Sequence, residues 1–398
     1  MHGRPLALLA LGMMPLGLVL GQKPAPVSAP PDFSVLASVQ YAHTDIYFHT
    51  PAGITPVLAG TKEISPGERL DLLVIVNHCA RDAGGRADVS YDLTVRFPNG
   101  KTQVVAGNAV ASKAKAPPGT LLFPRAVTTF VADAGDPPGD YRFEFAVSDH
   151  VAGTAAKKAV VIRLADSSQP LPNPENFNPA AWMAHYYQRP EPRRALSVLD
   201  ALSNDPAMAH RTNDQLGALL GFFEQLLWDN PWLIPQFKES LLEAEGNEQH
   251  VRALVLTRAT RSKPNFGDDL PKKVRKVLEK TGREQQPAPS LEPMSGGQLD
   301  LYWGRFFASG GYRPISDIVA IVRNYLPYAK SLEDFKKLAD KPKAPPPDVV
   351  RGAILNAALW SLKSNAREHP LVRNYLLSMS ESPDTPADLK AMLIRILG

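Results

Sequence analysis

Residues 88–105 read DVSYDLTVRFPNGKTQVV, and this stretch decides the fold of the first half of the chain. Apolar residues stand at every second position of its first part and alternate with mostly polar ones, which is the period of a half-buried β-strand. The PNG that follows is typical of a tight turn. The stretch therefore predicts a β-hairpin whose buried face carries Val89, Tyr91, Leu93, Val95 and Phe97.

Other stretches extend this pattern over residues 33–166. PPGDYRFEFAVSD and KKAVVIRL alternate in the same way, so each predicts a strand with one buried face. LDLLVIVN is continuously apolar, which predicts a central strand buried on both faces. Short strands at this spacing are typical of a sandwich or a barrel.

The segment PPGDYRFEFAVSDHVAG and the strand after it resemble the late strands of bacterial immunoglobulin-like and fibronectin-like domains, where such a turn leads into an aromatic-rich strand. The resemblance implies an immunoglobulin-like β-sandwich over residues 33–166. The chain departs from antibody-type domains because it has one cysteine and because all five tryptophans lie at position 182 or beyond. Only the architecture is expected to carry over.

Cys79 is the single cysteine, so an intramolecular disulfide is excluded. Two interpretations stay open for it. One is an intermolecular bridge or a reactive thiol, and the other is a small buried apolar residue at the end of a strand.

The pattern changes after residue 166. Residues 167–179, SSQPLPNPENFNP, are polar and proline-rich, which predicts an extended linker between domains. In residues 180–398, stretches such as LGALLGFFEQLLW and VRGAILNAALWSLKSNA have helical period, and prolines and glycines cut the helices into short lengths. The tryptophans recur at irregular spacings, so we expect an irregular α-helical hairpin array with one shared core.

LYWGRFFASGGYRP, residues 301–314, predicts the corner between two helices, with Gly310 or Gly311 ending the first and Pro314 in the first turn of the second. Trp303, Arg305 and Tyr312 are candidate partner-binding residues here, although an aromatic stripe at helical spacing is more often core. Together with ALWSLKSNAREHPLV, the corner resembles uncharacterised exported bacterial proteins with helical C-terminal halves. That resemblance implies no particular activity.

Residues 1–21 predict a signal peptide, because Arg4 is followed by an apolar run that is too short and too interrupted by prolines to span a membrane. An uncleaved anchor is the alternative. Residues 22–32 form a proline-rich leader. We therefore expect a periplasmic or secreted protein with no stable membrane span after cleavage of the signal.

Charge gives little guidance to partners. The chain has 44 basic and 40 acidic residues, and the β region balances 13 against 13, so no nucleic-acid partner is expected. The most basic segment, PKKVRKVLEKTGR, makes Lys272, Lys273 and Lys276 candidate residues for binding a protein or an anionic envelope polymer. The alternative is a solvated helix face above the apolar stripe of Val274, Val277 and Leu278.

No cofactor, metal or catalytic residue is expected. If VQYAHTDIYFHT forms a strand, His43, Asp45, Tyr47 and His49 share one face, but the two histidines would lie about 20 Å apart, too far to share an ion. SKAK and KTG echo the motifs of penicillin-binding enzymes, but they fall in different domains and the middle motif is missing.

The sequence thus predicts a multidomain β plus all-α protein, an immunoglobulin-like β-sandwich followed by an α-helical domain. It favours a non-enzymatic extracytoplasmic binding or assembly protein of the bacterial envelope. The alternative is an envelope hydrolase with an unmarked acid/base site. A cleft holding at least two carboxylates, or a histidine with raised burial, would favour the hydrolase, whereas a broad exposed apolar or charged groove would favour binding.

Overall fold

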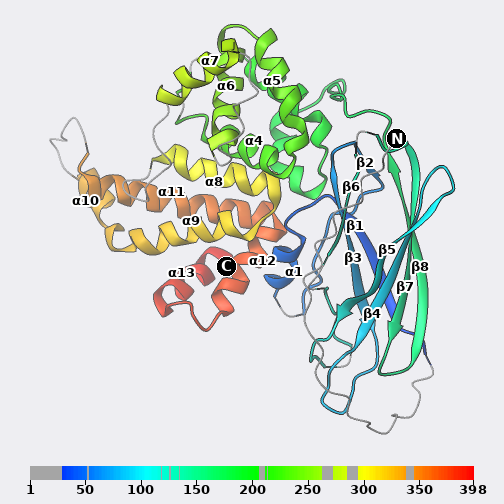
Figure 1. Cartoon of the computed structure of the whole chain (residues 1–398). Coiled ribbons are helices and arrows are strands. Elements are labelled where there is room, and N and C mark those ends of the chain that lie inside the picture. The colour runs from blue at the N-terminus through cyan, green and yellow to red at the C-terminus, as the bar shows by residue number, and fades with distance from the viewer. Residues whose placement is uncertain are drawn as a thin grey trace.

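The computed structural model describes residues 29–51, 53–117, 119–124, 127–133, 135–205, 211–212, 214–261, 272–284, 295–337 and 345–398. A β half is followed by a helical half, as the sequence predicts (Figure 1). The predicted signal peptide and most of the proline-rich leader lie outside the described residues.

The β half consists of two sheets. One has the order β1-β3-β6, with bounds Asp32–Ser38, Arg69–His78 and Thr128–Val131. The other has the order β2-β8-β7-β4-β5, with bounds Glu63–Ile64, Thr154–Leu164, Gly139–Asp149, Val89–Arg96 and Thr102–Ser112. Neighbouring strands are antiparallel, except that β2 runs parallel to β8.

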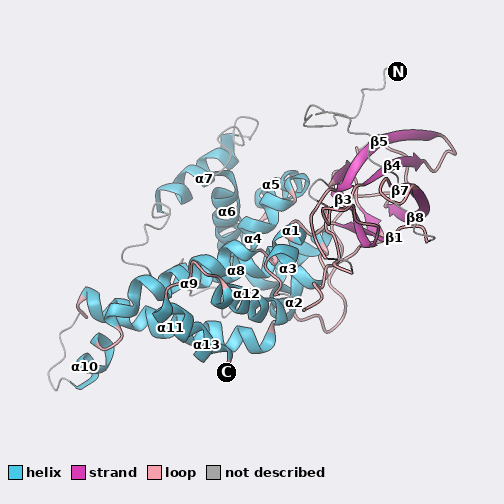
Figure 2. Ribbon diagram, turned by 90° about the horizontal axis from the view of Figure 1, so that it is seen from below, coloured by secondary structure: helices cyan, strands magenta, loops and turns pink. Residues whose placement is uncertain are grey.

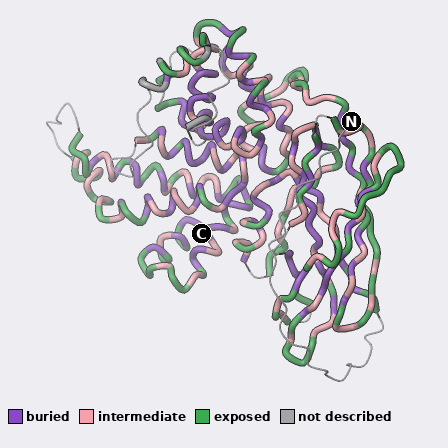
Figure 3. Tube along the Cα trace, viewed as in Figure 1, coloured by how far each residue is buried: buried purple, intermediate pink, exposed green. Residues whose placement is uncertain are grey.

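The facing sides of the two sheets share one hydrophobic core (Figure 3). The predicted hairpin is confirmed, since β4 pairs with β5 across a turn that contains Gly100. The predicted alternation is confirmed as well: apolar residues of β3, β4, β7 and β8 fill the core at every second position, among them Leu72, Val74, Tyr91, Leu93, Phe143, Phe145 and Ile162.

Strand β3 is buried on both faces, as its apolar sequence predicts. Leu72 and Val74 face the core between the sheets, whereas Asp71 and Leu73 are buried on the other side. On that side His43 Nδ1 lies 3.8 Å from the carboxylate of Asp71. The second face of β3 is thus covered by the segment between β1 and β3.

That segment is not the strand considered as one possibility for residues 39–50. It forms helix α1 (His43–Phe48), so His43, Asp45, Tyr47 and His49 do not share one face. Ala42 and Ile46 are buried among residues of the helical half, and this burial favours a helix where the sequence alone suggests a strand. Figure 1 shows α1 between the sheets and the helices.

The helical half consists of short helices that double back on one another (Figure 2). None of the helices in the described ranges is long and apolar enough to cross a membrane. The bounds are α2 Pro179–His185, α3 Ala195–Ser203, α4 Gly217–Asp229, α5 Ile234–Glu243, α6 Gly246–Arg261, α7 Lys272–Glu284, α8 Gly296–Ser309, α9 Tyr312–Tyr325, α10 Ser331–Lys337, α11 Pro347–Glu368, α12 Pro370–Glu381 and α13 Ala387–Leu397.

The described helices enclose two hydrophobic clusters, which corrects the expected single shared core. One cluster lies around α4 and α6, and the other lies around α9, α11 and α12. Helix α8 separates them, and Phe307 on this helix packs against both. The division arises because α8 carries apolar side chains on opposite sides.

Helices α4 and α8 approach each other through glycines. A Cβ on Gly221 would lie 2.1 Å from the carbonyl oxygen of Leu301, and a Cβ on Gly304 would lie 2.0 Å from that of Ala218. Both separations are far shorter than a van der Waals contact. The backbones of the two helices therefore touch, and only glycine fits at the crossing.

The predicted helix corner at residues 301–314 is confirmed. Helix α8 ends at Gly310, which is left-handed with φ 69°, and Gly311 precedes α9 with an extended backbone. Pro314 lies in the first turn of α9. At its other end α8 begins with a capping box, in which Ser295 accepts from the backbone N–H of Gln298 and the Gln298 side chain accepts in return.

Candidate functional site

The β half docks on the helix corner through α1. The side chain of Ile46 is 1% exposed and belongs to the same core as Phe306 and Tyr375. The carboxylate of Asp45 accepts a hydrogen bond from the backbone N–H of Tyr312 at 3.2 Å. The ring of His49 stacks on that of Tyr312 with centroids 3.5 Å apart. These contacts join residues more than 250 positions apart into one interface.

The proline-rich connector has no helix or strand over residues 167–178, turns at Glu175 and Asn176, and is bonded along the helical half, whose helix α2 begins at Pro179. The backbone N–H of Leu171 donates to the carbonyl of Arg193 at 2.9 Å, and the hydroxyl of Ser197 donates to the carbonyl of Leu171 at 2.7 Å. The side-chain amide of Gln236 donates to the carbonyl of Ser168 at 2.7 Å. The connector therefore lies against the helical half.

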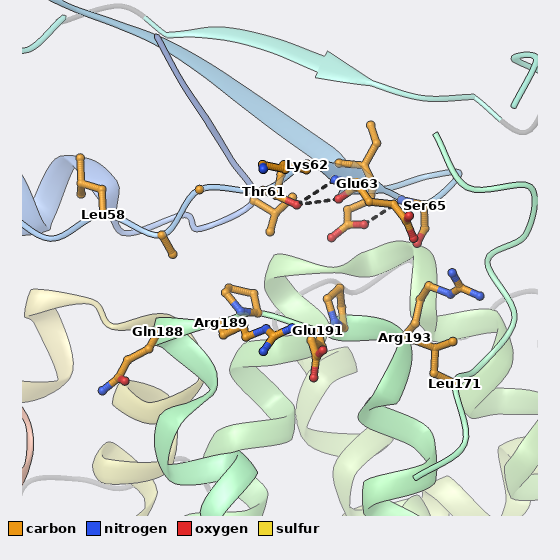
Figure 4. A pocket seen from close by; sticks show the side chains of 17 residues that line it. Leu58, Thr61, Lys62, Glu63, Ser65, Leu171, Gln188, Arg189, Glu191 and Arg193 are labelled. Atoms are coloured by element: carbon orange, nitrogen blue, oxygen red, sulfur yellow. Dashed lines mark hydrogen bonds between the residues drawn. The ribbon is translucent and has the colours of Figure 1, made fainter. Parts of the chain in front are cut away.

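A cleft of about 620 Å³ lies between the halves (Figure 4). One wall is the segment from Leu58 to Glu68, and the other is formed by Leu171 and residues 188–193. The lining carries charges of both signs. The basic residues are Lys62, Arg189 and Arg193, and the acidic residues are Glu63, Glu68 and Glu191.

Glu68 is the most buried charged residue of this cleft, at 4% exposure. Its Oε2 accepts a hydrogen bond from the backbone N–H of Ser65 at 2.9 Å, drawn as a dashed line in Figure 4. Burial raises the pKa of Glu68 to about 7, although the bonds from Ser65 and the charge of Arg193 oppose the rise. Glu68 can therefore hold or release a proton near neutral pH.

A second acidic group lies deeper in the interface. Asp229, at the end of α4, lines a small cavity with Tyr41 and Tyr186. Burial raises the pKa of Asp229 to about 7, while the hydrogen bond from Gln225 at 3.0 Å lowers it. Burial also raises the pKa of both tyrosines. Burial thus disfavours the ionised form of Asp229 and of both tyrosines.

Glu68→Gln should change how stability depends on pH. The pKa of Glu68 is higher in the folded chain than in the unfolded chain, so ionised Glu68 destabilises the fold. This destabilisation is complete above about pH 7 and absent below about pH 4. The variant should therefore gain up to about 3 kcal/mol of unfolding free energy at pH 8 and nothing at pH 4. Urea unfolding at both pH values measures this.

Glu63→Gln is the matched control, because Glu63 is exposed in the same segment. It should change the pH dependence far less than Glu68→Gln does, because the charge of Glu63 is only the smallest of the effects that shift the pKa of Glu68. An equal loss of stability for Glu68→Gln at pH 4 and pH 8 would mean that Glu68 acts on the unfolding free energy mainly through its hydrogen bond with Ser65 and not through its charge.

The candidate residues of the helix corner are all engaged within the chain. Trp303 is buried at 4% exposure in the core. Arg305 donates to the buried carboxylate of Glu224 at 3.1 Å and lies over the ring of Trp228. Tyr312 stacks on His49 as described above. The corner therefore receives the β half of the same chain, and its binding of another partner stays a prediction.

The basic segment forms α7, as expected. Lys272 and Lys276 are exposed, while Val277 and Leu278 pack against the cluster around α4. The side chains of Lys273 and of Val274, the first residue of the predicted stripe, lie outside the described residues. The solvated face above an apolar stripe is confirmed for the described side chains, and its role in binding stays a prediction.

Cys79 is buried at the end of β3 in the core between the sheets, which confirms the small apolar residue among its two interpretations. Arg81 donates a hydrogen bond to its sulfur at 2.7 Å.

In the part of the chain that the structure describes, no group of three or more histidine, cysteine, aspartate or glutamate side chains could hold a metal ion.

Sequence reasoning missed the cleft and its charged residues. The signal that could have pointed to it is weak: SPGER, residues 65–69, and RPEPRR, residues 189–194, each combine proline with charges of both signs. Such segments usually form solvated turns. Their pairing across the cleft depends on how the halves pack.

Comparisons with known proteins give no family. No protein family model and no curated protein matches the chain. Among solved structures, a family 123 glycoside hydrolase from Clostridium perfringens matches 43% of this chain with 8% identity and a TM-score of 0.22. The match spans 35% of that structure's chain. A likeness this small carries no conclusion about fold or activity.

Proposed function

We propose that this chain is a non-enzymatic extracytoplasmic binding or assembly protein of the bacterial envelope, and that the cleft between its halves is the binding site. The observation that carries the proposal is the lining of the cleft, where Lys62, Arg189 and Arg193 face a solvent-filled space together with three glutamates. A volume of about 620 Å³ suits a ligand of several residues.

The lining defines the chemistry of the ligand. A mostly polar wall does not suit a small apolar molecule, whereas cations and carboxylates on the same wall match a peptide segment that carries both charges. Glu68 and Glu191 would accept from its amines, and the two arginines would donate to its carboxylates. The contacts of α1 with the helical half hold the two walls in place, which limits the entropic cost of binding.

We further propose that the β half is immunoglobulin-like. Three observations support this topology. The strands divide into two facing sheets. Strand β1 pairs with β3 in one sheet, and the short β2 that follows β1 in the sequence pairs in parallel with β8 in the other sheet. The hydroxyl of Tyr141, near the start of β7, donates a hydrogen bond to the carbonyl of Pro137 at 3.0 Å. The last contact matches the tyrosine corner of such domains.

The charge-reversal variant Lys62→Glu/Arg189→Glu tests the binding site, because both side chains are exposed and line the cleft. The variant should fold normally and lose at least tenfold in affinity for a partner that the wild type captures from bacterial envelope extract. The matched control, Arg373→Glu/Lys390→Glu, changes the same charge on exposed positions of α12 and α13 and should bind as the wild type does. Equal capture by all three proteins would overturn the assignment.

An envelope hydrolase is the second candidate. The cleft meets the criterion set above for a hydrolase, because it holds more than two carboxylates, although its exposed basic residues also meet the criterion for binding. Glu68 has a pKa of about 7 and shares the cleft with Glu63 and Glu191, so a proton donor lies beside carboxylates that could activate water. If the chain releases soluble fragments from envelope polymer, Glu68→Gln should abolish the release while the chain stays folded. Release that survives this substitution would exclude Glu68 as the acid.

A further inference from the structure

Helix α11 presents a tryptophan to solvent. The side chain of Trp360 is 73% exposed, whereas the other four tryptophans are buried or half-buried. Its helix is held by Leu355, Ala358 and Leu362, which are buried in the core on the opposite side. Trp360 therefore contributes little to folding, and its exposed ring is available to a ligand.

Polar residues surround this ring on the same helix face. A hollow of about 470 Å³ is lined by Trp360, Lys363, Ser364, Arg367 and Glu368, which we call the Trp360 surface. Their spacings of three, four, seven and eight residues place them side by side along α11. Glu368 lies 3.8 Å from His185, whereas neither Lys363 nor Arg367 has an ion-pair partner among the described residues.

We propose that the Trp360 surface binds an acidic polysaccharide. The C–H face of a sugar ring packs on an indole ring, and the carboxylates of the same polymer would accept from Lys363 and Arg367. Ser364 and Glu368 supply a hydroxyl and a carboxylate for the sugar hydroxyls. Each group of the surface thus has a counterpart in one ligand.

Two other classes of ligand fit less well. A protein interface usually seats its aromatic anchor within a rim that excludes water, but the residues that line this hollow besides Trp360 are all polar. A nucleic acid would need a longer track of positive charge, whereas Glu368 interrupts this one and the whole chain carries only +4. Charge and shape therefore favour a sugar polymer with acidic groups.

Titration of the full chain with oligogalacturonate tests the proposal, with a neutral dextran and oligothymidylate as comparisons. Oligogalacturonate should shift the emission of the exposed tryptophan, and salt should weaken the binding. Trp360→Ala and Lys363→Gln/Arg367→Gln should each lose at least tenfold in affinity, while Trp360→Phe should retain part of it. Because Trp360 is exposed, the melting temperature of all these variants should equal that of the wild type.

The matched control is Arg373→Gln/Lys390→Gln, which removes the same charge elsewhere and should bind oligogalacturonate like the wild type. The cleft variant Lys62→Glu/Arg189→Glu should do so too, so failure at one site does not imply failure at the other. The proposal is overturned if oligogalacturonate does not bind, if dextran binds equally well, if oligothymidylate binds more tightly, or if Trp360→Ala has no effect.

Discussion

Gly221→Ala should destabilise the chain by about 3 kcal/mol or more, which is a large part of the stability of an ordinary domain. The added methyl group would lie 2.1 Å from the carbonyl oxygen of Leu301, 2.9 Å from its carbonyl carbon and 3.0 Å from its Cα. These are backbone atoms of α8, so no side-chain rotation relieves the contact. Helices α4 and α8 would have to move apart, and the hydrophobic cluster around α4 and α6 would lose packing.

Gly296→Ala is the matched control. Gly296 lies in the first turn of α8, and a Cβ there meets nothing within 4 Å. Since alanine favours a helix over glycine, the control should be neutral or gain up to about 1 kcal/mol. Urea unfolding followed by circular dichroism compares the two variants. Equal stability of Gly221→Ala and Gly296→Ala would show that the helices do not cross at the glycines.

Ile46→Ala should destabilise the helical half, although Ile46 belongs to the β half of the sequence. The side chain is buried in the core around α9, α11 and α12, so its truncation leaves a cavity and should cost about 2–5 kcal/mol. All five tryptophans lie at position 182 or beyond, so their fluorescence reports mainly the unfolding of the helical half, although Trp232 also packs against Gly67 of the β half. The urea midpoint read from this fluorescence should therefore fall.

Phe48→Ala controls for a change in α1 itself. Phe48 is on the same helix but is 57% exposed, so the substitution should change the unfolding free energy by less than about 0.5 kcal/mol. An unchanged tryptophan transition in Ile46→Ala would mean that the halves unfold independently. The contacts of α1 would then contribute nothing to the stability of the helices.

The strands and the helix corner could be predicted because their signals are local. In β4 the apolar residues Tyr91, Leu93 and Val95 alternate with polar ones, a pattern that follows from strand geometry and does not depend on which strands lie beside it. Helix α8 ends at Gly310 because glycine adopts the left-handed conformation at little cost. The candidate site differs in this respect. Glu68 and Arg193 are separated by more than a hundred residues, and no pattern along the chain relates them.

By itself, the sequence determined which parts of this protein are β and which are helical, because side-chain period follows from backbone geometry. Only the tertiary structure decided the conformation of α1, the glycine crossing of α4 and α8, and the charged cleft. A helix of six residues is unstable alone and forms here because Ile46 is buried by residues such as Phe306 and Tyr375, far along the chain. The cleft likewise exists because packing brings Lys62 and Glu68 opposite Arg189 and Arg193.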